Sequence, residues 1–489
     1  MGSSCRFRMW REHLVLTGGG RGEIRSKECR MSHYPNWRLL LLAGALMAGR
    51  ACFAQDFGVE PVVLTPSVEA APVAFEEVPV QNIELTDSIQ QTNWGEPCGN
   101  YDVGCYDVGC CNSGCCGAEG GGWFFDSWID QGYTANFDHP ASNFNTPMTF
   151  NDRADEYQMN QLYMALGKDV DDQNCCWSFG GRVDLLYGSD YFFTTARGLE
   201  TYTDGSQKWN GTGPRAAGAA ALYGLAMPQM YAEVFVPVGN GVKVKFGHFY
   251  TIMGYESVMA PQNFFYSHAY TMQYGEPFTH TGVLGTFDMG EHLTINAGVV
   301  NGWDNFNNPN GQLSALLGFQ YSNDCSSLSY SLINGKEDVD GQNNRFLQSL
   351  VYTRKLGQYW TYVFQSDFGL EENGKLDRNF QSDTAFWYGI NQYLYYKYTD
   401  KLDLGVRLEW FRDEDNARVI AIPIELLSTG GNYYEMTLGA NWRPRDFINI
   451  RPEIRYDWSN VDLAGAQGPY NDFMDKQMWT AAFDVIFKF

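Results

Sequence analysis

The carboxyl-terminal segment Gln477–Phe489 constrains the fold of this chain more than any other segment. In an extended strand, Trp479, Phe483 and Phe487 fall on one face, and Asp484 falls on the other. A strand of this length can cross a bilayer, and one apolar face beside one mixed face is typical of the closing strand of an outer-membrane barrel. A soluble edge strand can show this pattern once, so the interpretation depends on its repetition.

The same alternation recurs along the chain from about residue 127. Within 402–412, for example, Leu404 and Leu408 alternate with the charged residues Arg407 and Glu409. The expected strands are 127–137, 157–167, 178–188, 227–237, 242–251, 278–288, 291–302, 312–321, 327–334, 344–354, 358–369, 384–397, 402–412, 433–442, 447–458 and 477–489. The fold class is therefore predicted to be all-β, a transmembrane antiparallel β-barrel of about 16 strands.

The connections between the expected strands alternate in length. Links after even-numbered strands are short, such as 239–241 and 289–290, whereas links after odd-numbered strands are long, such as 189–226, 252–277 and 370–383. Outer-membrane barrels have short periplasmic turns and long external loops, and an even strand count places both termini on the periplasmic side. Hairpin connections also keep every backbone group paired within the barrel, as a lipid environment requires.

The composition agrees with alternating strands and excludes several classes of protein. Aromatic residues make up 16% of the chain, and no apolar run of about 18 residues lies beyond the amino-terminal region, which excludes helical spans. The net charge of −23 argues against nucleic acid as a partner. Motifs of zinc proteases, nucleophile elbows and phosphate loops do not occur, so we expect no enzyme, no cofactor and no metal. An enzyme that uses His248 or His280 at the barrel rim is the alternative.

The amino-terminal region predicts export. We interpret residues 1–54 as an upstream extension and a signal peptide, in which Arg38 supplies the positive end, Leu39–Ala48 the apolar core and Ala54 the last residue before cleavage. Modification of Cys52 as a lipoprotein is the alternative. Export and a barrel together predict the bacterial outer membrane as the location and membrane lipid as a partner.

The segment 55–126 is expected to separate the signal peptide from the barrel, which we place at 127–489. Its first part, 55–97, is rich in proline and predicts an extended linker. A disordered, cysteine-rich cluster from Cys98 to Cys116 follows. In an exported chain clustered cysteines usually form disulfides, so this cluster is expected to offer a disulfide partner site in the envelope. Metal binding is the alternative, although the cluster lacks paired C-x-x-C spacing.

Polar residues on the inward faces of the expected strands predict a water-filled pore. So many charged side chains would be costly to bury in a dry core, but they are tolerated where water reaches them. A barrel of about 16 strands is wide enough for an aqueous channel. The predicted pore-lining residues are Lys243, Lys245, Glu256, Glu276, Arg407, Glu409, Arg451, Glu453 and Arg455. A barrel plugged by loops or by the amino-terminal segment is the alternative.

Four short runs carry a resemblance to a known family. They are Gly247-His248-Phe249, Gly254-Tyr255-Glu256, Asn263-Phe264-Phe265-Tyr266-Ser267 and Pro277-Phe278-Thr279-His280-Thr281-Gly282-Val283. In this order they join a strand, a long loop and the next strand, and they resemble the OmpL-like β-barrel porin family. The run 132–137 looks like the first strand of that family's barrel. The resemblance covers residues 120–489 and implies an outer-membrane porin without indicating a solute.

The third long loop, 252–277, is expected to fold into the barrel and line a constriction, by analogy with general porins. Its aromatic residues would pack against the wall, and Glu256 and Glu276 would face basic wall residues across the passage. Folding of the loop onto itself outside the barrel is the alternative. The expected function is passive diffusion of small hydrophilic solutes and ions, with a homotrimer as the expected assembly. A plugged structural barrel that anchors a disulfide-linked envelope component is the second hypothesis.

Overall fold

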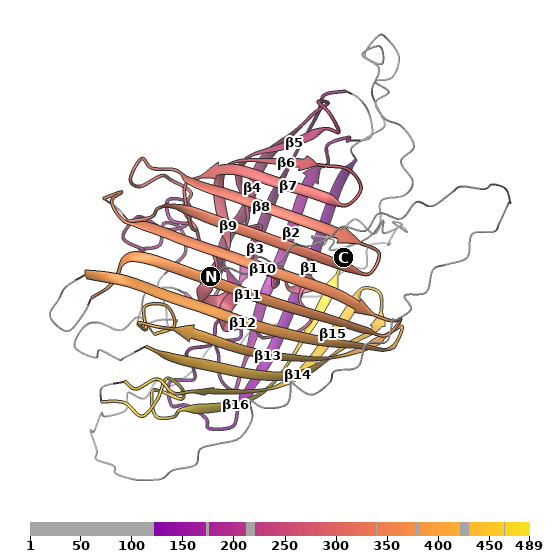
Figure 1. The fold of residues 1–489 in the computed structure, drawn as a ribbon. Helices are drawn as coiled ribbons and strands as arrows, with labels where there is room; N and C mark the ends of the chain where they lie inside the picture. Colours follow the sequence, from indigo (N-terminus) through magenta and orange to yellow (C-terminus); the bar gives the residue numbers. More distant parts are fainter. Residues whose placement is uncertain are drawn as a thin grey trace, which may run out of the picture. The chain divides into compact units, whose positions relative to one another are not determined.

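A computed structural model describes residues 122–172, 176–211, 221–338, 340–376, 382–420, 430–463 and 465–489. This part of the chain forms sixteen strands joined by turns and loops, in agreement with the predicted number (Figure 1). The strands are β1 (Trp123–Asn136), β2 (Glu156–Lys168), β3 (Ser178–Gly188), β4 (Gly224–Val236), β5 (Val242–Tyr250), β6 (Thr279–Asp288), β7 (Leu293–Val300), β8 (Ser314–Asn323), β9 (Ser326–Lys336), β10 (Asn344–Leu356), β11 (Trp360–Leu376), β12 (Ser382–Thr399), β13 (Leu402–Asp413), β14 (Gly431–Arg445), β15 (Ile448–Ser459) and β16 (Gln477–Lys488). Three short helical turns lie in the connections: η1 (Ser189–Thr194), η2 (Ala260–Gln262) and η3 (Thr271–Gly275).

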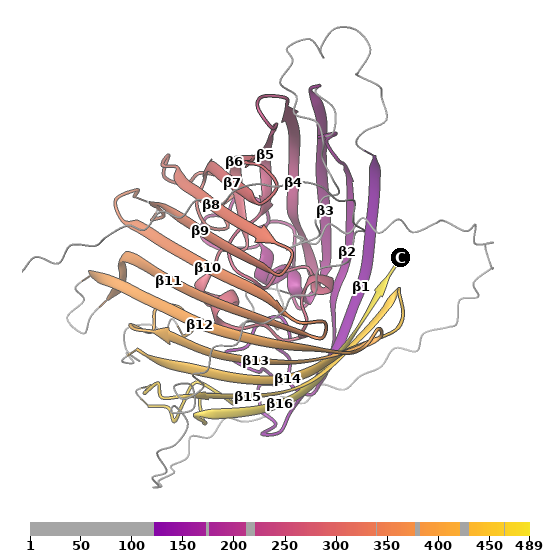
Figure 2. The ribbon, with the colours of Figure 1, turned by 45° about the vertical axis from the view of Figure 1, so that its right-hand side comes forward.

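The strands form one closed antiparallel sheet. Each strand pairs with its neighbours in the chain, and β1 also pairs with β16, from Trp128 opposite Lys488 to Asn136 opposite Thr480. In Figure 2 the yellow carboxyl-terminal strands meet the indigo β1. Closure gives every strand two partners, so the sheet has no edge with unpaired N–H and C=O groups.

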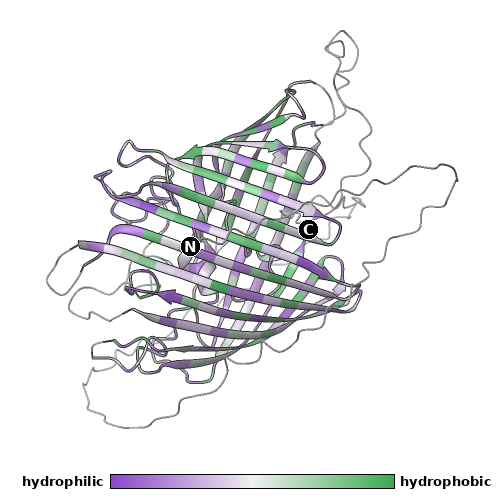
Figure 3. Ribbon diagram, viewed as in Figure 1, coloured by the Kyte–Doolittle hydropathy of each residue, from purple (hydrophilic) through white to green (hydrophobic). Residues whose placement is uncertain are grey.

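The two faces of each strand differ as the alternation predicts. On β13, Leu408 is 44% exposed, whereas the preceding Arg407 is fully buried. On β16, Phe483 is 47% exposed and Asp484 is fully buried. Apolar and polar residues therefore follow each other along the strands in Figure 3. Exposed apolar side chains outside and buried polar side chains inside are the reverse of a soluble protein and suit a barrel in lipid.

Short turns and long loops lie at opposite ends of the barrel. The links 237–241, 289–292 and 446–447 at one end contrast with 189–223 and 251–278 at the other. The backbone N–H of Phe489 donates to the carbonyl of Ser127 (3.0 Å), so the carboxyl terminus lies beside the start of β1 at the short-turn end. This end faces the periplasm in outer-membrane barrels.

The prediction of one long loop is wrong. The link expected over 370–383 is shorter, because β11 continues to Leu376 and β12 begins at Ser382, with an irregularity between Glu371 and Lys375. Ion pairs support this extended hairpin: Arg345 Nη2 lies 2.6 Å from Glu371, and Lys375 Nζ lies 2.5 Å from Asp415. The polar composition of the segment predicted a loop, but cross-strand pairing extends the strands beyond the apolar band.

Residues 1–121 lie outside the described part of the chain, and with them the predicted signal peptide, linker and cysteine cluster. These remain predictions, and β1 begins at Trp123, ahead of the barrel start predicted at residue 127. Two described cysteines, Cys176 and Cys325, lie in connections at the short-turn end, between β2 and β3 and between β8 and β9. Within the described ranges, no helix is long and apolar enough to cross a membrane.

The orientation of β13 can be tested with one cation on its outward face. Leu408→Arg places the charge near the middle of the strand, and it is expected to destabilise the folded barrel in lipid by about 2–4 kcal/mol. Leu402→Arg, on the same face at the short-turn end, is the control and should cost about 0–1 kcal/mol. Urea titrations in phospholipid vesicles measure both variants. Equal losses at the two positions would show that Leu408 does not face the hydrocarbon.

Candidate functional site

The connection between β5 and β6, residues 251–278, runs through the inside of the barrel. Phe265 and Tyr266 are each 3% exposed, and Tyr270 is fully buried. Hydrogen bonds join the loop to side chains of β2, β11, β13, β14 and β15, which lie far from β5 and β6 in the sheet. The loop therefore lies inside the barrel, as predicted, and does not fold onto itself outside.

Arg407 on β13 is the centre of the contact between the wall and the loop. Its Nη1 lies 2.8 Å from Oε1 of Glu256 in the loop, and its Nε lies 2.5 Å from Oε1 of Glu435 on β14. The same Nη1 donates to the carbonyl of Ser267 (2.7 Å), and the guanidinium lies 5.0 Å from the ring centre of Phe265. One fully buried cation thus holds one wall carboxylate and three groups of the loop.

Two further arginines of the wall bind carbonyl groups of the loop. Arg451 Nη1 on β15 donates to the carbonyls of Ala260 (2.8 Å), Asn263 (2.8 Å) and Phe265 (3.0 Å). Its Nε donates to Asp484 on β16. Arg455, also on β15, pairs with Asp457 and donates to the carbonyl of His268 (2.6 Å).

Wall carboxylates bind the amide groups of the same loop. Glu409 on β13 accepts from the backbone N–H of Tyr270 (2.6 Å) and of Thr271 (2.7 Å). Glu453 on β15 accepts from the backbone N–H of Tyr266 at 2.9 Å. The wall therefore supplies acceptors for loop amides and donors for loop carbonyls. This pairing satisfies an irregular backbone at membrane depth, which is tolerated only where protein or water meets its hydrogen bonds.

Inward-facing glycines of the wall make room for the aromatic residues of the loop. A Cβ at Gly405 on β13 would collide with the ring of Phe264, and one at Gly439 on β14 would lie 3.0 Å from Phe265. A Cβ at Gly132 on β1 would lie 2.6 Å from Cζ of Tyr266. Side chains larger than glycine would displace these rings, so the wall and the loop are complementary in shape as well as in charge.

The two predicted acidic residues of the loop differ in charge. Burial disfavours the ionised form of Glu256, but Arg407 and His268 outweigh it and hold the pKa of this carboxyl well below its usual range. Burial and the neighbouring carboxyl of Asp367 raise the pKa of Glu276 well above its usual range. The surroundings of Glu256 therefore favour its ionised form, whereas those of Glu276, which accepts a hydrogen bond from Gln365, disfavour ionisation.

The predicted pore-lining residues fall into two groups. Seven of them meet at the contact of loop and wall: Glu256, Glu276, Arg407, Glu409, Arg451, Glu453 and Arg455. Lys243 and Lys245 lie apart from these on β5, where Lys243 Nζ is 2.5 Å from Asp172 and Lys245 Nζ is 4.8 Å from the ring centre of Tyr231. The expected gap between wall cations and the loop carboxylate is absent, because Arg407 and Glu256 are in direct contact. The role of all nine residues in lining a pore stays a prediction.

A comparison with family models identifies the family to which this barrel belongs. Residues 124–489 match the model described as "Putative beta-barrel porin-2, OmpL-like". The chain belongs to this family of OmpL-like porins. The match spans the whole described barrel from β1 to β16, so the resemblance predicted from the sequence is confirmed, as is the outer membrane as the location.

Solved barrels similar to this OmpL-like porin are distant in sequence. OmpT of Vibrio cholerae in its trimer form is 11% identical with a TM-score of 0.46, and the alignment covers 76% of this chain and 100% of that chain. The outer membrane channel DcaP of Acinetobacter baumannii is 9% identical with a TM-score of 0.47, covering 76% and 99%. The anion-selective porin from Comamonas acidovorans is 8% identical with a TM-score of 0.48, covering 76% and 100%. No curated protein matches the chain in sequence.

Sequence reasoning missed the acidic partners of the wall arginines in this porin. Glu435 pairs with Arg407, Asp457 with Arg455, and Asp484 with Arg451. All three acids share the inward parity of their strands, so the alternation places them on the correct face. Their pairing was not visible, because it depends on the register between β13, β14, β15 and β16.

The contacts of Arg407 with the loop predict that its replacement lowers the stability of the barrel strongly. Arg407→Met removes the cation nearest to the buried Glu256 and Glu435, and we expect a loss of about 3–5 kcal/mol in the free energy of unfolding. Arg443→Met is the matched control, because Arg443 pairs with Asp403 near the short-turn end with its side chain 36% exposed. That change should cost about 1 kcal/mol or less.

Urea unfolding in detergent measures both variants, and limited proteolysis reports on the loop. In Arg407→Met the loop is expected to become cleavable between residues 251 and 278 while the strands stay protected. Equal stability losses in the two variants, with an intact loop in both, would contradict the role given to Arg407.

Proposed function

We propose that this OmpL-like porin admits small hydrophilic solutes and ions to the periplasm by passive diffusion, and that loop 251–278 decides what passes. One observation carries the proposal: a loop held by buried ion pairs lies inside a closed barrel of sixteen strands. Such a loop narrows the path and selects by size and charge. A homotrimer of these barrels, with membrane lipid around their outward apolar faces, is part of the same proposal.

The solute path is expected to follow the inner face of β5 to β8, opposite the wall that holds the loop. Lys243, Thr286 and Asn296 share one register row across β5, β6 and β7, and each keeps part of its surface accessible. Gln320 on β8 and Lys245 on β5 are also partly accessible. Polar side chains that remain in contact with solvent inside a barrel support a wet strip along this wall.

The histidines considered for catalysis support a channel rather than an enzyme. Both ring nitrogens of His280 have partners: Nδ1 is 2.9 Å from the carbonyl of Gly302, and Nε2 is 3.0 Å from Oγ1 of Thr251. Nδ1 of His248 is 2.8 Å from Oγ1 of Thr281. Both histidines are fully buried, so neither reaches a substrate at the rim.

A plugged barrel is the second candidate, and the burial of the wall favours it. Arg407, Arg451 and Arg455 are at most 2% exposed, so the loop covers this wall completely at their level. In that case the barrel would anchor the amino-terminal cysteine cluster, and disulfides would link it to another envelope component. High-mass species on non-reducing gels that collapse with reductant would favour this candidate.

Conductance separates the two candidates. The wild-type protein is expected to form channels in planar bilayers. Gly405→Val adds bulk to the inner wall, yet it is expected to raise conductance, because the added side chain displaces Phe264 and loosens the loop. A pore limited by the wall itself would instead lose conductance in this variant.

Gly285→Val is the control, because Gly285 lies on β6 and its added Cβ would face the end of the Phe287 side chain on the outward surface. Its conductance should equal that of the wild type. Native-like migration in unheated gels verifies that each variant is folded. If neither the wild type nor Gly405→Val conducts at any voltage, the proposal of diffusion through the barrel is wrong. That result would favour the plugged structural barrel.

A further inference from the structure

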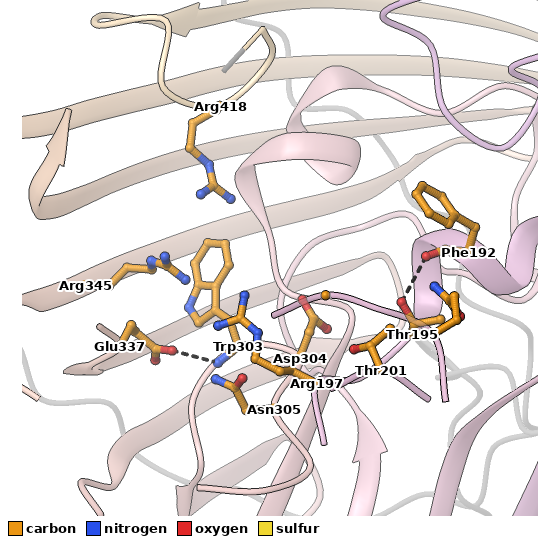
Figure 4. A pocket seen from close by; sticks show the side chains of 12 residues that line it. Phe192, Thr195, Arg197, Thr201, Trp303, Asp304, Asn305, Glu337, Arg345 and Arg418 are labelled. Carbon is orange, nitrogen blue, oxygen red and sulfur yellow. Dashed lines mark hydrogen bonds between the residues drawn. The ribbon is translucent and has the colours of Figure 1, made fainter. Parts of the chain in front are cut away.

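A second polar site lies at the outer mouth of the barrel, around Trp303 rather than around Arg407. It is a pocket of about 380 Å³ between the long connections β3–β4, β7–β8, β9–β10 and β13–β14. Its charged and aromatic lining comprises Arg197, Trp303, Asp304, Glu337, Arg345 and Arg418. Figure 4 shows these side chains around the open space.

Guanidinium groups gather around Trp303. The Cζ atoms of Arg345 and Arg418 lie 5.0 Å and 5.2 Å from its ring centre, and the Cζ of Arg418 lies 4.7 Å from the ring centre of Trp387. In Figure 4 the guanidinium of Arg197 points toward the same indole. Burial and the charge of Arg345 lower the pKa of Arg418 to about 10. The cations at this site therefore repel one another in a partly dry pocket, and a bound anion would relieve that repulsion.

The two carboxylates that line the pocket accept hydrogen bonds from the surrounding loops. Asp304 Oδ1 accepts from the backbone N–H groups of Phe278 (3.0 Å) and Thr279 (2.8 Å). Glu337 accepts from the backbone N–H of Trp303 (3.1 Å) and from Oγ of Ser314 (3.0 Å). Both acids thus hold the surrounding loops in place.

Glu371 is the acid that pairs directly with the pocket arginines. Arg345 Nη2 lies 2.6 Å from it, but Arg418 Nη1 is 3.8 Å away, beyond a hydrogen bond. The Nε of Arg418 donates to the carbonyl of Tyr274 (2.8 Å), which is a neutral partner. Glu371 therefore makes a short ion pair with only one of these two partly buried cations.

Two donors of the pocket have no acceptor. Nε1 of Trp303 and Nε of Arg345 are buried without a hydrogen-bond partner among the described residues, and Trp303 is only 6% exposed. Arg197 is exposed at the pocket. A buried donor without a partner is destabilising, so these two donors beside exposed Arg197 point to a ligand rich in acceptor oxygens.

We propose that this pocket binds the oxyanion group of a small acidic solute, a carboxylate or a phosphate, at the outer mouth of the barrel. Planar guanidinium groups match the two oxygens of such a group, and the indole N–H adds a further donor. Capture of the solute before it passes loop 251–278 rests on the proposed function. Binding itself does not, because the pocket can take up an anion whether or not the barrel conducts.

Isothermal titration calorimetry of the full chain in detergent tests the site, with sodium gluconate and sodium phosphate as anionic probes and sorbitol as the neutral probe. At least one anion is expected to bind with saturation, and sorbitol is not. The stronger anion identifies carboxylate or phosphate as the preferred group. Arg418→Gln and Arg197→Gln should each weaken binding about tenfold, the loss of one charge-assisted hydrogen bond.

Arg412→Gln is the matched control, because Arg412 lies at the end of β13 and pairs with Glu414 (2.8 Å) away from the pocket. It should bind the anion like the wild type. The site is wrong if neither anion binds the wild type, if sorbitol binds equally well, or if all three variants bind alike. Because calorimetry does not depend on conduction, failure of the diffusion proposal would leave this result intact, and the reverse also holds.

Discussion

Pairing of the backbone in lipid is the constraint on which the rest of this barrel depends. Hydrocarbon offers no hydrogen-bond partner, so each strand must find both of its ladders within the sheet. The pairing of β1 with β16 completes this requirement and closes the ring. Closure then separates the two faces of every strand, because one face meets lipid and the other meets the interior.

The interior of the barrel contains the irregular backbone of loop 251–278. Its N–H and C=O groups also need hydrogen-bond partners. The wall meets this demand with Arg451 for carbonyl groups and with Glu409 and Glu453 for amide groups. Buried ion pairs add little net stability, because desolvation offsets their attraction. Their effect here is positional, since moving the loop would leave several charges buried without partners.

Glycine sites and charged sites act together in this arrangement. Gly405 and Gly439 admit the rings of Phe264 and Phe265, and Arg407 lies across the ring of Phe265. Steric fit thus places the loop against β13 and β14, while the ion pairs select its register along those strands. At the outer mouth the opposite situation holds, because donors around Trp303 remain without acceptors. The wall arginines and carboxylates are thus paired with groups of the loop, whereas the mouth keeps two unpaired donors that suit a ligand.

The strands and their faces were predictable from the sequence because period-two alternation is a local property. The inward parity of Arg407 and Glu409 needs only a few neighbouring residues, and short links identify the periplasmic end. The extension of β11 to Leu376 was not predictable. A polar segment is assigned to a loop unless its cross-strand partners are known. For the same reason the raised pKa of Glu276 was not predictable, because it follows from burial in the barrel and from Asp367 on another element.

The sequence by itself determined the approximate number of strands, their order, and their lipid and inner faces, whereas the entry of the third long loop was expected only by analogy with general porins. Only the tertiary structure decided which charges meet. Arg407 and Glu256 are 151 positions apart, and the pocket around Trp303 is assembled from connections spread along the chain. Such contacts follow from strand register and from the path of the loop through the closed barrel, and neither leaves a local pattern in the chain.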